Sequence, residues 1–147
     1  MPEKETLRRA RADKREGKAP STQAGEFVRE EIDHIREGKH GARSTKQAIA
    51  IGLSKARRAG VKLSPPANGK ASTRRSATLA LEAGKHKTKP NPKRSRATEN
   101  ALRHEGRAAG SKLALSRQAH ATARKRTAAD RSASARKAAR TRARENA

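Results

Sequence analysis

Residues 44–60 read STKQAIAIGLSKARRAG and carry both the start and the stop signals of a helix. Ser44 can accept a hydrogen bond from the backbone N–H three residues on while Gln47 reaches back, and Gly60 supplies the left-handed position that ends a helix. Spacing of 100° per residue places an apolar side opposite a basic side that carries Lys46, Arg57 and Arg58. The basic side is either an ordinary solvated surface or a phosphate-binding one, and the rest of the chain favours the second.

The composition of the chain limits what it can fold into and bind. The 147 residues include 38 Lys and Arg against 14 Asp and Glu, which gives a net charge of +24 and predicts a polyanionic partner. Only 31% of residues are apolar and Phe27 is the one aromatic residue, so we expect at most one small domain. Cysteine is absent, and no stretch is typical of a signal peptide or membrane span, so we expect a cytoplasmic protein.

A second helix is predicted before residues 44–60. It begins at Ser21 or Thr22, ends at Gly38 and carries an apolar stripe, so residues 20–63 form a helical hairpin. The expected fold is all-α: this hairpin, an additional N-terminal helix within residues 1–19, and a largely disordered, partly helical basic tail over residues 64–147. Ile51 points away from the apolar stripe, which suggests either a homodimer contact through the hairpin or a singly exposed aliphatic side chain.

The acids of the second helix form a pattern of their own. Glu26, Glu30, Asp33 and Glu37 follow one another at helical spacing on the side opposite the apolar stripe, and we call them the acidic stripe. The stripe is either a solvated surface or a surface that attracts the basic tail. Glu31 falls among the apolar positions, so it should either pair with a base or lie at the edge of the packed surface.

The tail is the most basic part of the chain. Residues 64–147 carry 22 bases against 5 acids and few large apolar residues, which predicts disorder until a polyanion binds. Residues 72–110 echo the spacing of glycines and bases in the hairpin, so they are either a degenerate second hairpin or a chance likeness in a biased composition.

Most kinds of functional site are excluded by the sequence. No catalytic motif is present, which predicts a protein that is not an enzyme and has no cofactor, and the five histidines show no metal-ligand spacing. A lone Phe27 cannot form a base-stacking platform, and the connector at residues 37–44 is longer than a helix-turn-helix turn. Recognition of the phosphate backbone remains. The predicted nucleic-acid-binding residues are Lys46, Arg57, Arg58, Lys62, Arg74, Arg75, Lys93, Arg94, Arg96, Arg124, Lys125, Arg126, Arg136, Lys137, Arg140, Arg142 and Arg144.

Residues 21–63, STQAGEFVREEIDHIREGKHGARSTKQAIAIGLSKARRAGVKL, resemble a family of small basic bacterial proteins, some of them labelled plasmid stabilisation or DNA-binding proteins. Residues 93–126 resemble longer members of that family, and the Ala, Lys and Arg tail is similar to histone H1-like proteins. The resemblance implies association with DNA but supplies no catalytic or ligand residues. We therefore expect a non-enzymatic, largely sequence-independent DNA-binding protein of the nucleoid or of a plasmid. The alternatives are an RNA- or ribosome-associated protein and a protein-interaction module that its basic tail localises.

Overall fold

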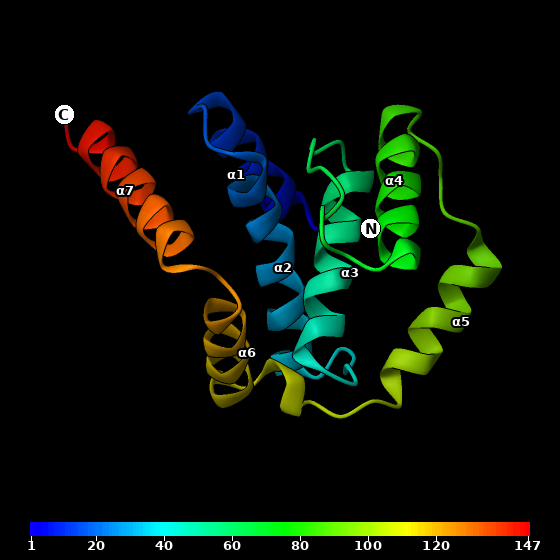
Figure 1. The fold of residues 1–147 in the computed structure, drawn as a ribbon. Helices are drawn as coiled ribbons and strands as arrows, with labels where there is room; N and C mark the ends of the chain where they lie inside the picture. The colour runs from blue at the N-terminus through cyan, green and yellow to red at the C-terminus, as the bar shows by residue number, and fades with distance from the viewer. The chain divides into compact units, whose positions relative to one another are not determined.

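The computed structural model describes all residues 1–147, and every regular element in it is helical (Figure 1). The chain divides into two compact units, residues 1–111 and residues 112–147. The first unit contains α1 (Lys4–Arg15), α2 (Pro20–Glu37), α3 (Thr45–Arg58), α4 (Ala71–Lys85), α5 (Pro92–Arg103) and the short 3-10 helix η1 (Ala108–Gly110). The second contains α6 (Lys112–Arg124) and α7 (Ala128–Glu145). The all-α prediction is confirmed.

The prediction of a largely disordered tail after residue 64 is wrong, because four α-helices lie there. Side-chain caps and small buried residues stabilise some of these helices, and neither depends on large apolar side chains. The side chain of Asn91 accepts hydrogen bonds from the first backbone amides of α5, and the Thr127 hydroxyl accepts one at the start of α7. In addition, α4 packs on α3, and its residues Ala77 and Ala80 are 5% and 1% exposed. Small alanines let the two helices approach closely, so little apolar bulk is needed.

The hydrophobic core of the first unit lies where α1, α2 and α3 meet. Its buried members are Ala10, Ala24, Phe27, Ala56 and Val61, and half-buried leucines from α1, α3 and the segment after α3 pack against them. Phe27 is 1% exposed, so the single aromatic residue of the chain belongs to packing. The predicted N-terminal segment thus contains a helix, α1, that contributes to the core.

The predicted ends of the hairpin helices are largely confirmed. The Ser44 hydroxyl accepts from the amide of Gln47 at 3.2 Å, the Gln47 side chain accepts from the amide of Arg43 at 2.7 Å, and Gly38 ends α2 with φ +77°. The first helical residue of α2 is Pro20, slightly before the predicted start, because proline suits the first position of a helix. Where α3 crosses α2, a Cβ added to Gly52 would lie 2.6 Å from the Val28 Cα, so the crossing requires glycine.

Residues 102–110 fasten onto the connector between α2 and α3. The amide of Gly41 donates to the Leu102 carbonyl at 2.9 Å, and the Arg107 guanidinium donates to the Ile35 carbonyl at 3.2 Å. From the start of α3, the Thr45 hydroxyl donates to the Ala109 carbonyl at 2.8 Å. The hairpin and residues 102–110 are therefore one packed body.

Candidate nucleic-acid interface and a buried polar cluster

Most of the predicted phosphate-binding side chains lie on the surface. Within the first unit they come from α3, the segment after it, α4 and α5; within the second they come from α6, the turn after it and α7. Sixteen of the seventeen are exposed, namely Lys46, Arg58, Lys62, Arg74, Arg75, Lys93, Arg94, Arg96, Arg124, Lys125, Arg126, Arg136, Lys137, Arg140, Arg142 and Arg144. The structure leaves these bases accessible to a ligand.

Arg57 is the exception and corrects the prediction for that position. Its residue is 7% exposed, and its guanidinium donates to the carbonyls of Leu63 at 2.9 Å and Ser64 at 3.2 Å. Burial lowers the pKa of Arg57 from its ordinary value, although an arginine stays charged at neutral pH. Arg57 therefore holds the segment after α3 against the helix and does not face a ligand.

The charges of the first unit are unevenly neutralised. All nine acids of residues 1–63 lie within 4.0 Å of a base or a histidine, and most of these pairs join α1, α2 and their flanking residues. By contrast, the eight exposed candidates of the first unit, from Lys46 to Arg96, form no ion pair with any acid of the chain. These eight bases of α3, the segment after it, α4 and α5 therefore carry positive charge that no acid neutralises.

The second unit has still fewer acids to offset its bases. Residues 112–147 contain eleven Lys and Arg against two acids, a net charge of +9. The Arg126 guanidinium donates to the Asp130 carbonyl at 3.0 Å and to the Ser134 hydroxyl, so this side chain also braces the start of α7. None of the residues of α7 is buried, and its bases face solvent.

The acidic stripe of α2 is solvated over only half of its length. Because α1 packs on α2, Glu26 is held by Arg9 at 2.6 Å, and Glu30 is only 3% exposed. Glu30 accepts from the backbone amide of Glu3 at 3.0 Å. Asp33 and Glu37, with side chains 47% and 56% exposed, remain at the surface. The contacts of Glu26 and Glu30 leave no pattern within α2 itself, because they come from Arg9 of α1 and from Glu3 just before it.

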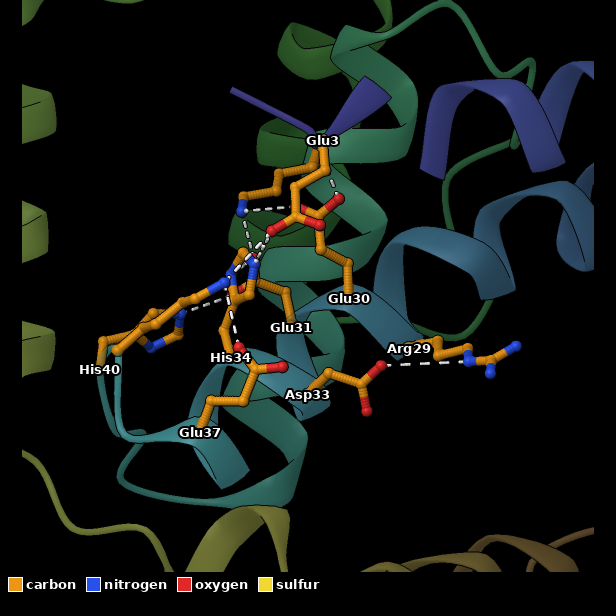
Figure 2. A network of polar contacts seen from close by, with 10 residues as sticks. Glu3, Arg29, Glu30, Glu31, Asp33, His34, Glu37 and His40 are labelled. Carbon is orange, nitrogen blue, oxygen red and sulfur yellow. Dashed lines mark hydrogen bonds and ion pairs between the residues drawn. The ribbon is translucent and has the colours of Figure 1, made fainter. Parts of the chain in front are cut away.

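A polar cluster is buried between α2, α3 and the connector (Figure 2). Glu31 is 1% exposed and pairs with Lys55 of α3, so the paired alternative for this carboxylate holds. The side chains of His34 and His40 are 14% exposed and lie beside it, with ring centroids 5.9 Å apart and ring planes at 84°. Glu31, His34 and His40 each offer a ligand atom, and these atoms lie within 4.8 Å of one another.

Sequence reasoning missed the gathering of His34 and His40. One signal was present, since Glu31 and His34 are three residues apart and so share a face of α2. The position of His40 follows from the turn at Gly38, which folds the connector back toward the helix, and from the attachment of Gly41 and Ala42 to residues 102–106. That second contact spans about sixty residues of sequence and leaves no local pattern.

One family model matches part of the chain. Residues 11–67 are similar to DUF6496, a family of unknown function. The matched segment holds the end of α1 (residues 11–15), all of α2 and α3 and the residues that Arg57 binds, and it ends before α4. No curated protein and no solved structure matches the chain. None of the helices is long and apolar enough to cross a membrane.

Proposed function

We propose that this protein is a non-enzymatic, largely sequence-independent DNA-binding protein, associated with the nucleoid or with a plasmid, that acts by neutralising phosphates. The observation that carries the proposal is the uneven pairing of charges: every acid of residues 1–63 is engaged by a base or a histidine, while the eight exposed candidates from Lys46 to Arg96 have no acidic partner. Such lysine and arginine side chains attract phosphates and release condensed counterions, but they do not recognise the sequence of nucleobases.

The second unit adds to the same proposal. Eleven bases on 36 residues, carried mostly by helices without buried side chains, suit a polyanion that is contacted along its backbone. Phe27 is buried, which leaves no aromatic surface for stacking unpaired bases. These features favour backbone contacts over sequence readout.

The test is the salt dependence of binding to random duplex DNA. We expect the logarithm of affinity to fall with the logarithm of salt at a slope steeper than about −5, which corresponds to about six or more neutralised phosphates. Removing two unpaired bases in K46Q/R58Q should reduce the slope by about 1.8, since each phosphate contact contributes about 0.9. The matched control R8Q/R29Q removes two bases that pair with Glu5 and Asp33, and it should change the slope far less.

A binding constant insensitive to salt, or equal changes of slope in the two double variants, contradicts the proposal. RNA presents the same phosphates, so crosslinking in the cell followed by sequencing of the bound nucleic acid identifies the physiological ligand. Recovery of ribosomal RNA in place of DNA would overturn the assignment to DNA while leaving the phosphate mechanism intact.

A further inference from the structure

The buried polar cluster has a carboxylate oxygen that the protein leaves unsatisfied. Glu31 Oε1 is held by the Lys55 ammonium, while Glu31 Oε2 is fully buried and accepts no hydrogen bond. His40 Nε2 lies 3.2 Å from Oε2, and His34 Nδ1 lies 4.0 Å from Oε1. A buried carboxylate oxygen without a partner is costly, so a group that the chain does not itself supply is expected at this position.

The outer nitrogen of each imidazole is already engaged. His40 Nδ1 lies 2.9 Å from the Gly41 carbonyl, and His34 Nε2 lies 2.9 Å from Glu3 Oε1. Both partners only accept, so these outer nitrogens carry the protons.

With the outer nitrogens as donors, the inner nitrogens are the ones that can offer a lone pair to a ligand. His34 Nδ1 and His40 Nε2 both face the Glu31 carboxylate, which is also electron-rich (Figure 2). Three electron-rich groups that face one another are stabilised by a cation between them, in addition to the Lys55 ammonium on Oε1. That cation is either a second proton on a ring, which makes an imidazolium, or a metal ion.

We propose that Glu31, His34 and His40 bind a divalent transition-metal ion of the zinc class. Two imidazoles and one carboxylate are ligands that Zn²⁺ favours, and three protein ligands leave a fourth position for water. A tetrahedral site with bonds of about 2.0–2.1 Å places ligand atoms about 3.4 Å apart. The present atoms lie within 4.8 Å of one another, so modest side-chain rotation completes the site.

The surroundings match what metal-bound histidines require. A carboxylate or carbonyl that holds the outer N–H fixes the ring and its tautomer, which is the arrangement of Glu3 with His34 and of Gly41 with His40. Lys55 occupies Oε1 and leaves Oε2 for the metal. A bound ion would link His40 of the connector directly to α2. It would also link Glu3, just before α1, and Lys55 of α3 to α2 through the ligands that they contact.

The experiment uses the full-length chain, freed of metal with a chelator and then titrated with Zn²⁺ by calorimetry and with Co²⁺ by visible absorption. We expect one ion per chain, d–d bands of a four-coordinate Co²⁺ site, and displacement of Co²⁺ by Zn²⁺. H34Q and H40Q should each weaken Zn²⁺ binding by at least about 100-fold, and E3Q by about 10–100-fold, the range for a residue that orients a ligand. The matched controls H86Q and H104Q, at exposed positions, should bind Zn²⁺ normally.

Nitrogen-15 NMR of the histidine rings separates the metal from the proton. Zinc should shift His34 Nδ1 and His40 Nε2, which are opposite nitrogens of the two rings, and leave the other three histidines unchanged. The proposal is overturned if Zn²⁺ leaves both rings unchanged, or if H40Q that retains its helix content binds Zn²⁺ as tightly as the parent. If H40Q unfolds, E3Q and the NMR measurement decide, because Glu3 is exposed and its loss should spare the fold.

Discussion

Replacing Lys55 by Met should be among the most damaging single changes in the first unit. The Lys55 ammonium pairs with Glu31 and lies 3.5 Å from Glu30, and the side chains of these two acids are 1% and 2% exposed. K55M keeps the length and apolar stem of the side chain but removes the charge. Two carboxylates then stay buried beside each other without the ammonium that offsets their charge.

The magnitude follows from the burial of the two acids. Breaking a buried ion pair by removing one partner costs about 3–5 kcal/mol. The Lys55 side chain is itself 26% exposed, so water reaches one side of the pair and the lower end of this range applies, about 3 kcal/mol. The control K46M removes an exposed, unpaired base from the same helix and should change the free energy of unfolding by less than about 0.5 kcal/mol.

The assay is urea unfolding followed by circular dichroism, with a chelator present so that no metal contributes. The double variant E31Q/K55M should be more stable than K55M, because Gln fills the same space without a buried charge. Equal losses for K55M and K46M would refute the reasoning, and so would a double variant that is no more stable than K55M.

Three further outcomes are expected. G52A should lower the free energy of unfolding by about 1–3 kcal/mol, because its Cβ would lie 2.6 Å from the Val28 Cα. G25A in α2 has open space around it and should raise the free energy of unfolding by about 0.5–1 kcal/mol. Urea unfolding of both variants tests this. Glu3 has a pKa below its ordinary 4.5, so its contribution to stability is present above that pH and is lost as the pH falls through the lowered value. E3Q should therefore reduce the pH dependence of the unfolding free energy below pH 4.5. An unchanged pH profile contradicts this. R57Q should loosen the segment after α3, seen as faster amide exchange at residues 61–64. Unlike R58Q, it should leave the salt slope of DNA binding unchanged. A reduced slope in R57Q would mean that Arg57 contacts phosphate.

The sequence predicted best those elements whose signals are local. The cap at Ser44, the glycine at residue 38 and the apolar spacing of residues 48–56 all lie within a few residues of the feature that they determine, and the helices formed as predicted. Exposed bases could also be located, because a lysine or arginine without a buried partner stays in water.

The sequence did not predict the burial of residues whose partners are distant in the chain. Glu30 is buried by α1, and Arg57 is buried by the segment that folds back after α3, and neither contact leaves a pattern at the residue itself. The tail was misjudged for a related reason. Helices α5 and α7 are stabilised by side-chain caps and α4 buries two alanines, and none of these residues is a large apolar one.

The uneven distribution of charge has a consequence at the scale of a single helix. Salt screens exposed charges over about 8 Å at physiological ionic strength, while a helix with its side chains is about 10–12 Å across. The acids that remain exposed on α2, such as Asp33 and Glu37, therefore oppose a phosphate only where it approaches them within that distance. A phosphate that approaches unpaired bases such as Lys46 or Arg58 meets their full local charge, because no acid of the chain pairs with them. On the proposed mechanism, the binding strength of each surface depends on its own unpaired bases, and net charge alone is a poor measure of where a polyanion would bind.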